Sequence, residues 1–342
     1  MNNTPIKKSI FFVASPLQLI ASELICKKYD ANREHIIVFY KNDYSSMMSS
    51  EVWQKKIIML WPRYYPMKGL FGVGKRLLYN LELIKKTIGK CDSLYFYSAV
   101  YDTEAINYFV SFLSKIVGKE NFSARVLPDG AISMRRYPQS PFKRFLKMLR
   151  SLRFIYNRKL IYTHFSGDRI GSDAKFIDYI YVFSFVPHNY QKNKVIELPR
   201  ISENFFIKKS PYVCQKINAL VIGQPLKGFK LMSCKDIKKT SDEIENFLHK
   251  VKPNKIYYKP HPRDKNNTLN KNHYEILDID ISIEEHLAKN FYNYILGVNS
   301  TVLILAKHLY GDSGCVKSFG IDRVKFKDNS EKKDMIKLFS SF

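Results

Sequence analysis

The sequence lacks an apolar run long enough to cross a bilayer. No stretch of about 18 consecutive apolar residues occurs along the chain, so no segment is expected to span a membrane. The apolar run from Ile10 to Ala14 is interrupted by Ser15-Pro16, and it is too short for the core of a signal peptide. We therefore expect a cytoplasmic protein, or one that lies peripherally on the cytosolic side of a membrane.

The sequence also lacks the cysteine patterns that bind metal. Its 5 cysteines are odd in number and widely separated, and none forms a C-x-x-C pair or a Cys/His cluster with metal-ligand spacing. We interpret them as reduced thiols that are buried or have no chemical role. They are Cys26, Cys91, Cys214, Cys234 and Cys315.

Acidic residues are scarce. The chain has 31 Asp and Glu against 56 Lys and Arg, which gives a formal net charge of +25. Such a charge attracts polyanions, including nucleic acid, anionic lipid, phosphorylated glycans and nucleotides. Zinc-finger spacing and an RNP-like aromatic motif are both absent, which argues against nucleic acid as the partner. A basic nucleic-acid-binding protein nevertheless stays open as an alternative.

Strand and helix patterns alternate through the chain, which predicts an α/β fold with parallel sheets and helices on both faces. Expected in the first half are strands at Ser9–Ala14, His35–Tyr40, Ser93–Tyr97 and Ala124–Leu127, and helices at Pro16–Tyr29, Lys75–Ile88 and Thr103–Val117. Expected in the second half are strands at Ala219–Ile222, Ile256–Tyr258, Tyr294–Val298 and Cys315–Ser318, and helices at Ser241–Val251, Ile283–Lys289 and Ser300–His308.

The length of 342 residues suits two domains. The stretch from about residue 185 to 215 contains Pro187, Pro199 and Pro211 and little periodicity, and we interpret it as the linker. We expect two Rossmann-like domains, residues 1–190 and 191–342, with their sheets facing a central cleft.

The segment Lys259-Pro260-His261-Pro262-Arg263 is the most informative motif. A strand is expected to end at Lys259, and the two prolines fix the backbone around His261. Ligands of open α/β sheets bind at this edge of the strands, where a rigid histidine between two cations suits a phosphate leaving group. The alternative is a histidine that merely follows the end of a strand.

Three further motifs follow predicted strands. Asp129 in Pro128-Asp129-Gly130 is placed to act as a general base, although Pro-Asp-Gly is also an ordinary turn. Gly223-Gln224 would let a nucleotide approach the backbone, or is a plain strand-to-helix loop. Asn299-Ser300-Thr301 would hold a phosphate at a helix N-terminus, or is a plain helix cap.

Together these motifs resemble those of bacterial sialyltransferases with the GT-B fold. Asp129-Gly130, His261-Pro262 and Ser300-Thr301 follow the order of that group's D/E-D/E-G, H-P and S-S/T motifs. The opening Ala14-Ser15-Pro16-Leu17-Gln18-Leu19 is similar to the start of glycosyltransferase family 52, the lipooligosaccharide sialyltransferases. One departure is Pro128, which stands where these enzymes have the first acidic residue.

The resemblance implies inverting transfer of sialic acid from CMP-sialic acid to a terminal sugar, with galactose expected, of a bacterial surface glycan. Asp129 would be the general base, and His261 would contact the leaving phosphate and protonate or stabilise it. The implied donor-binding residues are Gly223, Gln224, Lys259, Pro262, Arg263, Glu284 (on the ribose hydroxyls, with Glu285 next to it), Asn299, Ser300 and Thr301. The implied acceptor-side residues are Ser15, Gln18 and Gly130, with Tyr97 as a further candidate.

The resemblance implies no cofactor and no metal ion. Asp278-Ile279-Asp280 does match the D-x-D pattern of metal-dependent transferases, but it equally fits a solvated strand end. Three other functions stay open: a transferase of another CMP-nonulosonate, a transferase of CMP-Kdo, and an inactive GT-B protein that binds glycan. The resemblance also allows a homodimer.

Residues 135–159 form a basic segment without Asp or Glu, in which apolar residues alternate with cations at near-helical spacing. Such a segment suits an anionic membrane surface, where it would serve a lipid-linked acceptor. The alternative is a helix that packs on the core and leaves a basic face in solvent. The cations are Arg135, Arg136, Lys143, Arg144, Lys147, Arg150, Arg153, Arg158 and Lys159. The apolar residues are Phe142, Phe145, Leu146, Leu149, Leu152 and Phe154.

Overall fold

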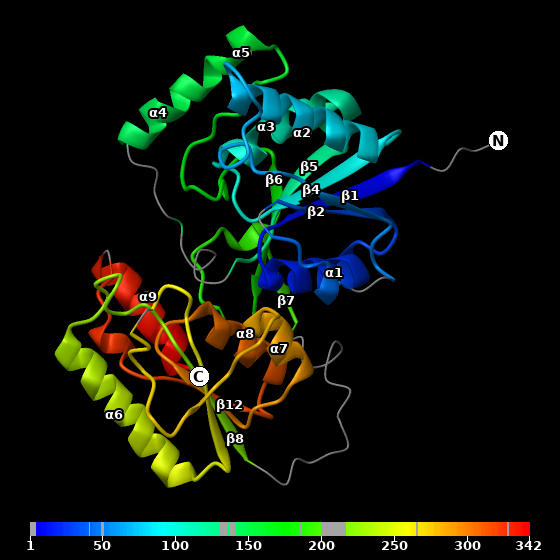
Figure 1. Cartoon of the computed structure of the whole chain (residues 1–342). Coiled ribbons are helices and arrows are strands. Elements are labelled where there is room, and N and C mark those ends of the chain that lie inside the picture. Colours follow the sequence, from blue (N-terminus) through cyan, green and yellow to red (C-terminus); the bar gives the residue numbers. More distant parts are fainter. Residues whose placement is uncertain are drawn as a thin grey trace. The chain divides into compact units, whose positions relative to one another are not determined.

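The computed structural model divides the chain into two compact units (Figure 1). Unit 1 is Met1–Phe183 with His188–Leu198, and unit 2 is Ser184–Pro187 with Pro199–Phe342. The boundary predicted at residue 190 lies close to this crossing of the chain. The structure describes residues 5–40, 42–48, 51–129, 136, 141–184, 186–199, 217–264, 266–326 and 328–342.

Unit 1 is built on a seven-stranded sheet in the order β3-β2-β1-β4-β5-β6-β7. Every pair of neighbouring strands is parallel. The strands are β1 (Lys7–Val13), β2 (Glu34–Phe39), β3 (Lys55–Ile58), β4 (Ser93–Ser98), β5 (Phe122–Val126), β6 (Ile177–Phe183) and β7 (Val195–Leu198). The central strand β1 is buried from Lys8 to Val13, as expected of a parallel strand that is covered on both faces.

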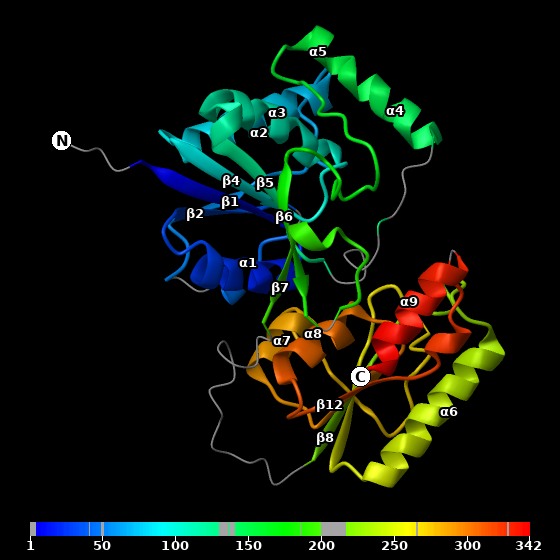
Figure 2. The same ribbon diagram turned by 180° about the vertical axis from the view of Figure 1, so that it is seen from behind.

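Helices cover both faces of this sheet (Figure 2). α1 lies on one face, and α2 and α3 lie on the other, where Leu81 and Phe109 pack into a core with Ile10 and Phe12 of β1. The helices are α1 (Pro16–Tyr29), α2 (Gly72–Ile88), α3 (Glu104–Val117), α4 (Pro141–Ser151) and α5 (Arg153–Tyr156). Short 3-10 turns occur at η1 (Ser45–Met47), η2 (Lys119–Asn121) and η4 (Lys192–Lys194).

A buried polar cluster lies on the face of the sheet opposite to α2 and α3. Asp30, which follows α1, accepts hydrogen bonds from the hydroxyls of Ser9 (2.5 Å) and Tyr97 (3.0 Å). Arg125 of β5 lies 3.9 Å from the carboxylate of Asp30 and donates to the Tyr97 hydroxyl at 2.8 Å. Tyr97 therefore belongs to this cluster, although the sequence suggested it as a candidate for the acceptor side.

Unit 2 contains a five-stranded parallel sheet in the order β10-β9-β8-β11-β12. Its strands are β8 (Asn218–Ile222), β9 (Lys255–Lys259), β10 (Glu275–Ile276), β11 (Tyr294–Gly297) and β12 (Cys315–Ser318). Its helices are α6 (Cys234–Val251), α7 (Ile283–Lys289), α8 (Thr301–Tyr310), α9 (Asn329–Ser340) and the 3-10 turn η6 (Ile321–Arg323). α6 lies on one side of the sheet, and α7 and α8 lie on the other (Figures 1 and 2).

The predicted α/β class with parallel sheets is confirmed, but several elements differ from those expected. β3 and β7 are short strands with exposed positions at the edges of their sheet, so their sequences lack a strong apolar pattern. β7 lies inside the stretch that was interpreted as a linker. α6 begins at Cys234 rather than at residue 241, because Ser233 caps it by accepting from the backbone N–H of Asp236.

We expect Arg125→Met to lower the free energy of unfolding of unit 1 by about 3–5 kcal/mol, because it removes the buried cation that pairs with the carboxylates of Asp30 and Asp178. Both tryptophans, Trp53 and Trp61, belong to unit 1, so tryptophan fluorescence during urea unfolding reports on this unit alone. The control is Lys159→Met, which removes an exposed pair with Glu82 and should cost about 0–1 kcal/mol. Equal effects of the two changes would contradict the importance of the buried pair.

Candidate active site

Ser15 and Asp129 meet at the carboxyl edge of the unit 1 sheet. Ser15 follows β1 and Asp129 follows β5, on either side of β4. The Ser15 hydroxyl donates to a carboxylate oxygen of Asp129 at 3.4 Å and caps α1 by accepting from the backbone N–H of Gln18. Asp129 is half-buried, so its carboxylate is fixed yet still reaches solvent. Gly130, the third predicted residue here, lies outside the described residues.

Gln18 has a different geometry from the one expected of a residue that contacts the acceptor. Its side chain is buried, at 1% exposure, and its amide oxygen accepts from the backbone N–H of Ala14 at 2.7 Å. This bond closes the turn between β1 and α1. In this geometry Gln18 positions Ser15 and does not itself face a ligand.

Tyr40 is a neighbour of Asp129 that the sequence did not single out. It follows β2, and its ring stacks on Trp61 with the ring centroids 5.1 Å apart. Burial, followed by the nearby negative charge of Asp129, raises the pKa of the Tyr40 hydroxyl well above its usual range. Tyr40 therefore stays neutral. Its position at the end of a strand could have indicated a site residue. A tyrosine that ends an apolar strand is, however, more often part of the core.

In unit 2, Gln224 joins two loops that are far apart in sequence. β8 lies between β9 and β11, so the residues after these strands meet at one edge. The amide oxygen of Gln224 accepts from the backbone N–H groups of Val298 (3.1 Å) and Asn299 (2.9 Å). Its amide nitrogen donates to the side-chain oxygen of Asn299 at 2.9 Å. The predicted pair of Gln224 and Asn299 is therefore a single hydrogen-bonded unit.

Gly223 is required by close packing. A Cβ at this position would lie 2.8 Å from the backbone oxygen of Lys259 and 2.6 Å from the hydroxyl of Tyr258. The Gly223 N–H donates to that same Lys259 oxygen at 2.9 Å. Any side chain would push β8 away from the loop that carries His261.

His261 is held by its own loop. The backbone N–H of Arg263 donates to Nδ1 of His261 at 3.0 Å, so the neutral ring carries its proton on Nε2. Asp264 is buried and ties down the loop by accepting from the backbone N–H and the hydroxyl of Thr268, both at 2.9 Å. Burial, and then the positive charge of Arg263, lower the pKa of His261 below its usual range. At neutral pH the ring is an uncharged donor through Nε2.

Two predicted cations lie on either side of His261. Lys259 is half-buried, with its ammonium group 3.5 Å from the backbone oxygen of Leu277. Burial, and then the positive charge of Lys259, lower the pKa of His286 on α7. Arg263 is exposed, as is Pro262 next to it, and its guanidinium lies 5.9 Å from the ring centroid of Phe229. Phe229 had no signal in the sequence, because it lies in a loop that has no motif.

Ser300 and Thr301 occupy the start of α8. The Ser300 hydroxyl caps the helix by accepting from the backbone N–H of Val302 at 3.2 Å, and Thr301, the first helical residue, is exposed. The first turn of a helix has unpaired N–H groups and the positive end of the helix dipole, which together favour an anion.

Glu284 lies in the first turn of α7, which Ser282 caps. Burial raises the pKa of the Glu284 carboxyl above its usual range. A carboxyl in such a position can exchange its hydrogen bonds with water for those of sugar hydroxyls. Its neighbour Glu285 is buried and pairs with Lys289 at 2.7 Å, which makes Glu284 the better ligand of the two.

Metal-ligand geometry is not found in the described part of the chain, where no group of three or more His, Cys, Asp or Glu residues could hold an ion. Asp278 and Asp280 of the D-x-D pattern are both exposed. A cavity of about 580 Å³ lies in unit 1 between α4 and the loop that includes Tyr162 and Phe165. No predicted site residue lines it.

We expect the pKa of His261, followed by NMR titration of its ring protons, to lie below that of an unperturbed histidine. Arg263→Gln should raise this pKa, because it removes a neighbouring positive charge. It should not restore the unperturbed value, because burial is the larger cause. Lys227→Gln, which removes an exposed charge from the same unit, is the control and should leave the pKa unchanged. A pKa that falls in Arg263→Gln would show that the environment of His261 is not the one described.

Comparison with solved structures identifies the fold class. A Listeria monocytogenes protein described as a UDP-N-acetylglucosamine 2-epimerase aligns over 98% of this chain and 87% of its own, with a TM-score of 0.50 and 8% identity. A 2,6-sialyltransferase from Photobacterium sp. JT-ISH-224, solved with CMP and lactose, aligns over 97% and 76%, with a TM-score of 0.50 and 11% identity. These likenesses confirm the predicted GT-B class of two parallel-sheet α/β domains.

Comparison of sequences places the family. No curated protein matches the chain. The family model described as alpha-2,8-polysialyltransferase (POLYST) matches residues 9–316, which confirms the resemblance to sialyltransferases. That match spans the strand-end loops of both sheets, including those that carry Asp129, His261 and Ser300. The chain therefore belongs to the alpha-2,8-polysialyltransferase (POLYST) family.

Proposed function

We propose that this glycosyltransferase moves sialic acid from CMP-sialic acid to a sugar of a bacterial surface glycan, with inversion and without a metal ion. The main observation behind the proposal is that one edge of the unit 2 sheet carries His261, the Gln224–Asn299 pair and the start of α8. Membership of a sialyltransferase family supports the same reaction.

The donor is proposed to bind to unit 2. Its phosphate would accept hydrogen bonds from Nε2–H of His261, from Ser300 and Thr301, and from the start of α8, in the positive potential of Lys259 and Arg263. Gly223, Gln224 and Asn299 would contact the cytidine, with Pro262 beside the phosphate and Glu284 on the ribose hydroxyls. As the bond between sialic acid and phosphate breaks, negative charge grows on the phosphate, and His261 would stabilise or protonate it.

The base is proposed to be Asp129. Its carboxylate would remove the proton from the acceptor hydroxyl while that oxygen attacks the anomeric carbon. Ser15 would hold the carboxylate through its hydrogen bond, and Gln18 would hold Ser15. Attack on the face opposite to the leaving phosphate gives inversion.

Two acceptors are candidates. The sequence resemblance suggested a terminal galactose, and the neighbouring sialyltransferase was solved with lactose. The name of the matching family instead suggests a terminal sialic acid that receives an α2,8 linkage. Both acceptors present a hydroxyl to the same base, so the catalytic roles do not change between them.

We expect acceptor-dependent release of CMP from CMP-sialic acid, measured with lactose and with a sialylated oligosaccharide. Asp129→Ala and His261→Ala should each reduce the rate by about 10²- to 10⁴-fold, because each removes a proton-transfer or charge-stabilising group. Asp322→Ala and His249→Ala, which change exposed residues without a proposed role, are the matched controls. The acceptor that raises release identifies the glycan.

Other outcomes of this assay lead to the alternatives. The protein could bind CMP without turnover on either acceptor and then show turnover with CMP-Kdo or another CMP-nonulosonate. That result would show that this other CMP-sugar is the donor. CMP binding without turnover on any donor would indicate an inactive glycan-binding protein, in keeping with Pro128. An absence of CMP binding, together with salt-dependent DNA binding, would favour a nucleic-acid partner.

Chelation tests the metal-free part of the proposal. We expect EDTA to leave the transfer rate unchanged, because hydrogen bonds and cations of the protein stabilise the leaving phosphate. A rate that falls with EDTA and returns with added Mg²⁺ or Mn²⁺, and that Asp278→Ala also abolishes, would assign the D-x-D pattern to metal binding instead.

The proposal also includes a peripheral position on the inner-membrane face, through residues 135–159, next to a lipid-linked acceptor. No helix among the described residues is long and apolar enough to span a bilayer. A homodimer, which the resemblance allows, would be measured by analytical ultracentrifugation.

A further inference from the structure

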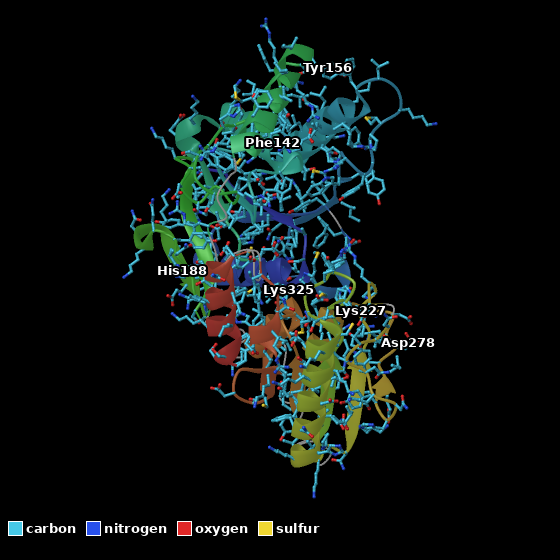
Figure 3. All side chains as sticks on the ribbon, turned by 90° about the vertical axis from the view of Figure 1, so that its left-hand side faces the viewer. Phe142, Tyr156, His188, Lys227, Asp278 and Lys325 are labelled. Carbon is cyan, nitrogen blue, oxygen red and sulfur yellow. The ribbon has the colours of Figure 1, made fainter. Side chains whose placement is uncertain are left out.

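α4 presents its apolar side chains to solvent. Phe142, Phe145, Met148 and Leu149 are exposed, Phe142 to 70%, and the exposed Leu152 extends the row beyond the helix. Positions spaced by three and four residues share one face of a helix, so these side chains form a single stripe. Figure 3 shows Phe142 on α4 and Tyr156 on α5.

The polar side of α4 faces the body of unit 1. Lys147 is buried, at 8% exposure, and its ammonium group lies 3.2 Å from the Asp102 carboxylate. Arg150 donates to the backbone oxygen of Asp102 at 3.0 Å and accepts from the Tyr108 hydroxyl through its own backbone oxygen at 2.9 Å. A surface helix of a globular protein usually buries its apolar stripe and exposes its polar one. α4 does the reverse, so the alternative of a helix packed on the core through its apolar face is wrong for the described residues.

A second segment extends the exposed apolar area. Tyr64, Tyr65, Leu70 and Phe71, which precede or lead into α2, are all exposed, Leu70 to 80%. The ring of Phe71 stacks on Tyr156 of α5, with the ring centroids 5.1 Å apart. α5 also lies beside the start of α2 in both ribbon views (Figures 1 and 2). The two segments therefore form one surface, called here the outer surface: residues 64–71 and 142–156.

Exposed cations lie in and beside the outer surface, where the carboxylates of Glu104 and Glu82 are already paired with Arg153 and Lys159. Neither residues 52–81 nor residues 130–167 contain Asp or Glu. Lys68, Lys75, Arg144 and Arg158 are exposed, and none of them forms an ion pair within the described residues. Exposed aromatic and aliphatic side chains surrounded by unpaired cations are the chemistry of an interfacial membrane-binding surface.

We propose that the outer surface binds an anionic phospholipid bilayer, with α4 lying in the plane of the interface. The stripe of α4 would enter the boundary between headgroups and acyl chains, and the cations would contact the headgroups. At 1.5 Å per residue α4 is about 16 Å long, so it is too short to span a hydrocarbon core of about 30 Å. A second copy of the chain suits the surface less well, because two like-charged surfaces would repel each other.

This inference deepens the proposed function, and it rests on the part of that function that places the acceptor at a membrane. It adds residues 64–71 to the basic segment and fixes which face of α4 is outermost. Vesicle binding needs no donor or acceptor, so the inference and the proposed transferase activity can fail separately.

The experiment is sedimentation of the full chain with vesicles of phosphatidylcholine alone, or containing about 30% phosphatidylglycerol. The apolar variant is Phe142→Ser with Phe145→Ser and Leu149→Ser, and the charge variant is Lys68→Glu with Lys75→Glu and Arg158→Glu. All six side chains are exposed, so both variants should fold. We expect the wild type to bind the anionic vesicles, and each variant to bind them at least about tenfold more weakly.

Matched controls separate this surface from the charge of the whole chain. The charge control is Lys235→Glu with Lys238→Glu and Lys250→Glu on α6, which changes the net charge by the same amount in unit 2. The apolar control is Ile116→Ser with Ile276→Ser, which changes exposed apolar residues elsewhere. Both controls should bind anionic vesicles like the wild type, and all variants should keep transfer to a soluble acceptor.

Three results would overturn the inference. The first is a wild type that does not bind the anionic vesicles. The second is a charge control that loses as much binding as the charge variant, which would show attraction by net charge alone. The third is a wild-type dimer that the apolar variant converts to a monomer while vesicle binding is unchanged, which would show that a second copy covers the surface.

Discussion

Parallel pairing of β8 with both β9 and β11 is the constraint on which the candidate site of unit 2 depends. Because all three strands run in the same direction, the loops after Ile222, Lys259 and Gly297 must meet at one edge of the sheet. Two details make this meeting close: Gly223 leaves room for the oxygen of Lys259, and Gln224 joins the third loop through three hydrogen bonds. A shift in strand register would separate residues that are distant in sequence, so the sheet itself acts as part of the site.

The two sheets carry opposite chemistry at their edges. In unit 1 the residue proposed as the base is a carboxylate, held by a serine hydroxyl and next to a neutral tyrosine. In unit 2 the corresponding residues are a neutral histidine, two cations and a helix start. This distribution suits transfer between an uncharged hydroxyl, which needs a base, and a phosphate, which needs donors.

Much of the candidate site could be predicted from the sequence, because strand ends in parallel sheets can be recognised from apolar runs followed by glycine, proline or hydroxyl residues. Asp129, His261 and Ser300 all follow such runs. Side-chain direction could not be predicted: Gln18 reads as a polar residue near a site, yet its amide closes a turn. Contacts between segments distant in the sequence, such as that of Phe229 with Arg263, could not be predicted either. Helical spacing likewise revealed two faces of α4, but only the contacts of Lys147 show which face is inward.

The polar contacts between α4 and the rest of unit 1 converge on one carboxylate. Asp102 is buried and faces Lys147 and the guanidinium of Arg169, while its backbone oxygen accepts from Arg150. Loss of the Asp102 charge would leave Lys147 buried without a counterion, whereas loss of Lys147 would leave the carboxylate only the more exposed Arg169. Substitutions at positions 102, 147 and 169 are therefore expected to be coupled in evolution. Among relatives that keep this helix, substitutions at the three positions are expected to arise together, and apolar changes on the opposite side of α4 are expected to drift independently of them.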